Sequence, residues 1–187
     1  FAITLKRRAG LYPGGPYLAV FGLCFAAWGF DGFNSYLLLL RGEVFLYEPQ
    51  NWLRLTTGTL MGMTLSTFAV ALFNQGVWRD PTEESTVASP QTLLALLAIA
   101  VGIIVTVLWR PAFLLGPLAA LSAGGVLALL TIVNAMLLLI ARKRHGQIGE
   151  WRELLPYLGV GLALAVLEVS LIAGLRLAFV PQIGGPV

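Results

Sequence analysis

Long apolar runs alternate with short polar connections along the whole chain. Each run approaches the roughly 20 residues that a helix needs to cross the hydrocarbon core of a bilayer. The pattern predicts an all-α fold, a polytopic transmembrane helix bundle with about five spanning helices, and a single domain over residues 1–187. The predicted spans cover about 15–38, 51–77, 91–109, 113–141 and 153–180.

Composition strengthens this interpretation. Hydrophobic residues make up 58% of the chain and charged residues only 11%, whereas soluble domains are roughly half apolar and a quarter charged. The net charge of +3 would suit nucleic acid, but the Lys and Arg residues cluster at the ends of apolar runs, which is the membrane-anchoring pattern. We therefore expect the lipid bilayer, and no nucleic acid, as a partner.

The distribution of basic residues also predicts an orientation. One side of the membrane would hold the N-terminus and the loops 78–90 and 142–152, and the positive-inside rule makes it the cytoplasm of a bacterium. The eight Lys and Arg residues on that side are Lys6, Arg7, Arg8, Arg79, Arg142, Lys143, Arg144 and Arg152. The other four are Arg41, Arg54, Arg110 and Arg176.

Polar side chains interrupt the first two spans in a pattern. Asp31 and Asn34 are three residues apart and share a helix face, and Asn51 and Arg54 repeat this spacing at the start of the next run. A helix hairpin would bring the pairs together, with a salt bridge from Asp31 to Arg54. The cluster either locks the hairpin or forms a polar pocket for a headgroup or small solute.

Glu168 is the second candidate, because it falls near the centre of the last span, where a carboxyl group must be paired or protonated. Three readings remain open: a hydrogen-bonded structural residue, a proton relay, or a side chain that faces a partner subunit. Hydroxyl groups at a similar depth in the second span are expected hydrogen-bond partners: Thr64, Ser66 and Thr67.

Small residues mark the helix surfaces where another helix can approach closely. The second span carries Gly58 and Gly62 in a GxxxG motif, which is common in membrane helices. A longer ridge at four-residue spacing lies on the fourth span: Gly116, Ala120, Gly124 and Ala128. Between spans two and three, we expect 78–90 to be a solvated loop that ends in a helix N-cap at Ser89 and a first-turn proline at Pro90.

Catalytic and metal-binding patterns are missing from the sequence. Cys24 is the only cysteine and His145 the only histidine, so a His/Cys-rich metal site cannot be assembled. No GxSxG, HExxH or P-loop motif occurs. We therefore expect no enzyme, metal or cofactor. The basic loop 142–152 is either a topology determinant or a specific docking or lipid site.

The first 75 or so residues resemble DUF2085, a family of bacterial membrane proteins of unknown function. The matching residues are Arg7, Gly10, Tyr12 and Gly14, then Asp31 and Gly32, then Asn51, Arg54, Thr57 and Gly58. That family usually carries a cysteine pair just before the Gly-x-Tyr run, but Leu5 and Arg8 stand at the corresponding positions here. The resemblance implies a shared core around Asp31 and Arg54, without cysteine chemistry.

Two functions remain as hypotheses. The first is a non-enzymatic scaffold or accessory subunit of a larger membrane assembly, which would bury the small-residue ridges against other membrane subunits. The alternative is a small-solute or proton transporter that uses Glu168 and the Asp31/Arg54 cluster. An enzyme acting on lipid or quinone would need a nucleophile, a base and a metal, and the sequence offers no such constellation.

Overall fold

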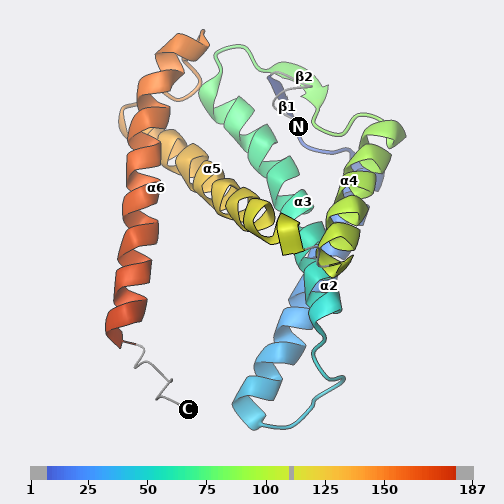
Figure 1. Ribbon diagram of the computed structural model, residues 1–187. Helices are drawn as coiled ribbons and strands as arrows, with labels where there is room; N and C mark the ends of the chain where they lie inside the picture. Colours follow the sequence, from blue (N-terminus) through green and yellow to red (C-terminus); the bar gives the residue numbers. More distant parts are fainter. Residues whose placement is uncertain (1–7, 110–111, 180–187) are drawn as a thin grey trace. The chain divides into compact units, whose positions relative to one another are not determined.

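The computed structural model describes residues 8–109 and 112–179, and this part of the chain is almost entirely helical (Figure 1). Five of its helices are long and apolar enough to cross a membrane. They are α2 (Gly15–Arg41), α3 (Asn51–Val77), α4 (Pro90–Trp109), α5 (Leu115–Ala141) and α6 (Trp151–Phe179). The predicted all-α fold with about five spanning helices is therefore confirmed. Lys6, Arg7, Arg110 and residue 180, the predicted end of the last span, lie outside the described residues.

The chain divides into two compact units. Unit 1 comprises Phe1–Gln75 and Pro81–Leu115, and unit 2 comprises Gly76–Asp80 and Gly116–Val187. Unit 1 therefore contains α2, most of α3 and α4, whereas unit 2 contains nearly all of α5 and the whole of α6. The single domain over residues 1–187 stays a prediction.

The core of unit 1 lies where α2, α3 and α4 meet. Phe21 and Cys24 of α2 contact Met63 of α3 and Ala100 of α4, and the ring of Phe21 meets that of Phe68 edge-on, with centroids 6.0 Å apart. Cys24 is a small packing residue here, as the apolar run around it indicates. Side chains of one apolar face on each helix thus hold the three helices together.

Local signals in the sequence explain where these helices begin and end. The hydroxyl of Ser89 accepts a hydrogen bond from the Thr92 N–H at 3.3 Å, so Ser89 caps α4 and Pro90 occupies its first position, as predicted. At the end of α2, Gly42 adopts a left-handed φ of 71° and donates its N–H to the Leu38 carbonyl at 2.8 Å. This turn directs the chain back toward α3.

A short parallel pair of strands joins two distant segments of unit 1. Strand β1 (Ala9–Leu11) pairs with β2 (Thr82–Ser85), and the Thr82 N–H donates to the Arg8 carbonyl at 2.7 Å. The side chain of Asn74 donates to the Ala9 carbonyl at 2.9 Å. The expected solvated loop 78–90 is thus only partly correct, because pairing with β1 folds it back and buries Val87 in the core.

Unit 2 is built on a close crossing of α5 and α6. A Cβ atom placed on Gly161 of α6 would lie 2.6 Å from the Thr131 carbonyl oxygen and 3.0 Å from the Ala135 nitrogen of α5. The backbones therefore approach so closely that only glycine fits. Ala135 and Ala165 are fully buried beside this crossing.

The end of α3 attaches to the loop between α5 and α6 inside unit 2. Trp78 forms a parallel bridge with Ile148, and the Gly146 N–H donates to the Gly76 carbonyl at 2.8 Å. The ring of Trp78 also meets that of Trp151 at 4.8 Å, edge to face. These contacts bury Trp78 and Ile148 almost completely and fix the start of α6.

Candidate functional site: the polar end of the α2–α3 hairpin

The loop 42–50 folds back onto α2 through Asn34. The Asn34 side-chain amide donates to the Tyr47 carbonyl at 2.9 Å, and its oxygen accepts from the Leu46 N–H at 3.1 Å. Asn34 is only 1% exposed, so both ends of its amide must find partners. The loop backbone supplies them, and the loop is thereby held against the helix.

Asp31 lies one turn earlier on the same face and connects three segments. The Tyr47 hydroxyl donates to one carboxylate oxygen at 2.6 Å. The Thr57 hydroxyl of α3 lies 3.4 Å from the other oxygen and also contacts the Leu53 carbonyl of its own helix at 3.0 Å. Asp31 is 4% exposed, and a buried carboxylate must be hydrogen-bonded. The short bond from Tyr47 has the length typical of a hydroxyl bound to a charged oxygen. We call Asp31, Asn34, Tyr47 and Thr57 the hairpin cluster.

The hairpin cluster changes the acidity of Tyr47, which lies in the loop outside the spanning helices. The pKa of Tyr47 is raised to about 12, first by burial, then by the hydrogen bond to Asp31 and the negative charge of Asp31, while Arg54 has a smaller lowering effect. Tyr47 is therefore protonated throughout the physiological range and serves as a fixed hydrogen-bond donor.

The expected salt bridge between Asp31 and Arg54 is not formed in the described part of the chain. The Asp31 carboxylate accepts a hydrogen bond from the Tyr47 hydroxyl instead. Arg54 and Asn51 are both exposed. The structure thus brings two of the four predicted cluster residues together, and it adds Tyr47 and Thr57, which helical spacing alone could not link to Asp31.

A cavity of about 610 Å³ lies beside the hairpin cluster. Ser35 and Arg54 contribute polar groups to it, and the remaining lining residues are Tyr36, Leu38 and Leu39. The hydroxyl of Ser35 is buried and has no hydrogen-bond partner among the residues the structure describes. A buried hydroxyl without a partner is costly, which makes Ser35 an unusual residue in the lining of this cavity.

Glu168 pairs with a residue that the sequence analysis did not single out. The Asn134 side-chain amide of α5 donates to a carboxylate oxygen of Glu168 at 3.3 Å, and Asn134 is 7% exposed. The expected partners instead donate to carbonyl groups of their own helix: Thr64, Ser66 and Thr67. Asn134 could have been noticed, because it is the one amide in the apolar run of α5.

The small residues predicted to pack helices lie at the surface of their units. Gly58, Gly62, Gly116, Ala120 and Gly124 are all exposed. A Cβ atom on any of these four glycines would meet no atom within 4 Å. The close helix approach occurs at Gly161 instead, which belongs to no GxxxG motif and was missed for that reason.

Within residues 8–109 and 112–179, no three His, Cys, Asp or Glu side chains gather closely enough to hold a metal ion. Comparison with protein-family models, with curated proteins and with solved structures finds no match to this chain. The hairpin cluster and the Asn134–Glu168 pair therefore have to be interpreted from their own chemistry. The hairpin cluster is a network of hydrogen bonds that joins α2, the loop 42–50 and α3, and the Asn134–Glu168 pair is a single hydrogen bond between α5 and α6.

Proposed function

We propose that this protein is a non-enzymatic subunit of a larger membrane assembly. One observation carries the proposal: within unit 2, no helix covers the small-residue ridge of α5. At 100° per residue, Gly116, Ala120 and Gly124 continue the helix face on which Thr131 and Ala135 meet Gly161. Figure 1 shows α6 diverging from α5 along this ridge. Within unit 2, one face of α5 is thus covered by α6 at one end and has no helix packed on it at the other.

The character of the ridge supports a partner helix. Helices associate in lipid through close van der Waals packing, which small residues permit. Lipid chains gain little from such a groove, because they pack equally well against leucine. The apolar surface of the five helices and the absence of a reactive constellation at either polar site agree with a structural role.

The proposal is tested by purification after mild detergent extraction. The unmodified protein should copurify with other membrane subunits in fixed ratio. Ala120→Leu and Gly124→Leu should release them, because the larger side chains fill the ridge. Ser122→Leu is the matched control, since it places the same side chain about 160–200° around the helix. Recovery of the unmodified protein alone, or equal loss in the control, would contradict the proposal.

A transporter is the second candidate, supported by the cavity beside Ser35 and Arg54 and by the intramembrane Glu168–Asn134 pair. Glu168→Gln should then abolish proton flux into vesicles that contain a pH-sensitive dye, while Glu150→Gln, in the loop before α6, should not. A protein that conducts no protons in either form would rule out proton transport through Glu168.

We also propose the orientation given by the basic residues, with the N-terminus and the loop 142–152 in the cytoplasm of a bacterium. The pairing of β1 with β2 supports one part of it, because these strands flank two membrane crossings and must lie on the same side; the choice of the cytoplasm rests on the basic residues. Single cysteines at His145 and Phe45, in a Cys24→Ser background, test it in spheroplasts. A membrane-impermeant maleimide should label position 45 and spare position 145.

We further propose that the chain is a diverged member of DUF2085. Asp31 and Thr57 both belong to the matching residues, and their side chains form a hydrogen bond in the structure. If this is correct, members of the family that retain these residues should place a loop hydroxyl or similar donor on the aspartate. An experimental structure of one such member, with its aspartate unpaired, would count against the relationship.

A further inference from the structure

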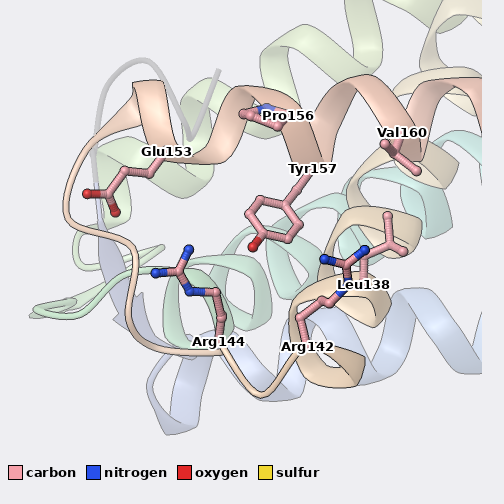
Figure 2. Close-up of a pocket in the computed structure, with 7 residues that line it drawn as sticks. All are labelled: Leu138, Arg142, Arg144, Glu153, Pro156, Tyr157 and Val160. Carbon is pink, nitrogen blue, oxygen red and sulfur yellow. The ribbon is translucent and has the colours of Figure 1, made fainter.

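A second cavity, of about 360 Å³, lies in unit 2 where α5 ends and α6 begins. Its volume is within the usual range of ligand sites, roughly 300–1,000 Å³. Figure 2 shows its lining: Leu138, Arg142, Arg144, Glu153, Pro156, Tyr157 and Val160. The cavity is separate from the hairpin cluster, which belongs to unit 1, and neither proposed function uses it.

Two guanidinium groups face this cavity. Figure 2 shows the Arg142 and Arg144 side chains rising from the end of α5 and from the loop toward α6, with the Tyr157 hydroxyl directed between them. Neither guanidinium forms a hydrogen bond or ion pair with another residue in the described ranges. The cavity therefore presents several unused N–H donors and two positive charges.

The only acidic residue in the lining is Glu153, and its carboxylate already has a role. It accepts a hydrogen bond from the Gly149 N–H at 3.1 Å and so closes the N-terminal end of α6. The lining carries two cations against one anion. This excess favours a negatively charged ligand.

The backbone holds the two arginines in place. The Lys143 N–H donates to the Ile140 carbonyl at 3.0 Å and the Arg144 N–H to the Leu139 carbonyl at 2.8 Å, which is the Schellman pattern of a helix end. Lys143 takes the left-handed position, with φ of 54°. The tight turn directs Arg142 and Arg144 to the cavity, whereas Lys143 between them does not line it.

The rest of the lining is apolar and lies on the spanning helices. Leu138 belongs to α5, and Pro156 and Val160 belong to α6. Two helices that cross a bilayer end at the depth of the lipid headgroups, so a ligand here meets arginine at one end and hydrocarbon at the other. An inorganic anion would use only the first of these surfaces.

We propose that this cavity binds one anionic phospholipid. Its phosphodiester lies between Arg142 and Arg144 and accepts a hydrogen bond from Tyr157, while the first part of its acyl chains contacts Leu138 and Val160. Arginine suits this task because its planar donors match the oxygens of a phosphate. The inference goes beyond the role as a subunit, since lipid can bind whether or not the ridge of α5 has a partner.

The experiment measures binding of short-chain phosphatidylglycerol to the delipidated protein in a nonionic detergent by isothermal titration calorimetry. Arg142→Gln/Arg144→Gln should weaken binding roughly tenfold or more, because two charge-assisted contacts are lost. Lys143→Asn/Arg152→Gln is the matched control: it removes the same charge from the loop and the first turn of α6, at residues that do not line the cavity, and asparagine tolerates the left-handed position. It should bind within about twofold of the unmodified protein.

Additional binding measurements identify the ligand. Tyr157→Phe should weaken binding by about threefold, the loss of one neutral donor. Phosphatidylcholine of the same chain length should bind more weakly, and inorganic phosphate should not displace the lipid at equal concentration. Circular dichroism establishes that the variants remain helical.

Two results would overturn the proposal. Equal weakening of lipid binding in both double variants would mean that the general positive charge of this region attracts the lipid, and not the cavity itself. Displacement by inorganic phosphate as effective as that by lipid would assign the cavity to a soluble phosphate instead.

Discussion

The α2–α3 and α5–α6 hairpins each bring two long apolar helices together, but they do so by different means. Near its loop, the first is joined by polar side chains, with Asp31 bound to Tyr47 and Thr57. The second is joined by the close approach of two backbones at Gly161. A membrane hairpin can thus be fixed either by a few hydrogen bonds or by the absence of one side chain.

The largest effect is expected where the second hairpin depends on glycine. Gly161→Ala puts a methyl group 2.6 Å from the Thr131 carbonyl oxygen, and the helices must move apart, at a cost of about 1–3 kcal/mol. Gly159→Ala is the matched control, because a Cβ atom there meets nothing within 4 Å. It should stabilise α6 by about 0.5–1 kcal/mol through helix propensity. Unfolding in a denaturing-detergent titration measures both. A change in unfolding free energy of the same sign in both variants would refute the close crossing of α5 and α6.

The first hairpin should respond to loss of a hydroxyl group. Tyr47→Phe leaves the buried Asp31 carboxylate with only the longer bond from Thr57, at a cost of about 1–3 kcal/mol. Asp31→Asn removes the charge but keeps an acceptor. The double variant Tyr47→Phe/Asp31→Asn should therefore lose about 1 kcal/mol less unfolding free energy than the sum of the two single losses. Tyr36→Phe, at a tyrosine that is 56% exposed, should change the free energy of unfolding by less than about 0.5 kcal/mol. If the losses of the two single variants simply added up in the double variant, the hydrogen bond between Tyr47 and Asp31 would contribute nothing to stability.

The pH dependence of the first hairpin follows from the same bond. The pKa of Tyr47 is raised to about 12, from about 10 in an unfolded chain. Its contribution to stability is therefore complete below about pH 10 and is lost as the pH rises toward 12. The phenolate absorbance of the unmodified protein, minus that of Tyr47→Phe, should show one group titrating near pH 12. A midpoint near 10 would mean that Tyr47 does not donate to Asp31.

The C-terminal ends of α2 and α5 both carry a residue in the left-handed conformation. The left-handed residue is Gly42 after α2 and Lys143 after α5. A side chain in this conformation costs roughly 1 kcal/mol, so Lys143→Gly should stabilise unit 2 by about that amount or less. Gly42→Ala should destabilise unit 1 by a similar amount. The midpoints of thermal unfolding report both, and a destabilised Lys143→Gly would contradict the assigned cap.

The sequence was sufficient to predict the helices because the signals that mark them are local. Each apolar run is long enough to span a bilayer, and Ser89 with Pro90 marks a helix start from two adjacent residues. The partners of Asp31 could not be predicted in the same way. Spacing on a helix says which residues share a face, but Tyr47 reaches Asp31 through a loop whose path depends on Asn34 and on backbone groups.

The small-residue patterns could not identify a partner helix, for a related reason. A ridge such as Gly116, Ala120 and Gly124 shows where one helix permits close approach, whereas contact requires a second helix in the right position. Gly161 meets that condition without belonging to a GxxxG motif. Likewise, Asn134 could be recognised as unusual within α5, but its pairing with Glu168 depends on how α6 crosses α5.

The strand pair β1–β2 has a consequence for how the protein is made. The Thr82 hydroxyl contacts the Arg8 carbonyl across 74 positions of the chain, and α2 and α3 lie between them. During synthesis, the ribosome adds Thr82 only after both of these helices have been completed. Closure of this small sheet therefore follows the synthesis of the first two helices.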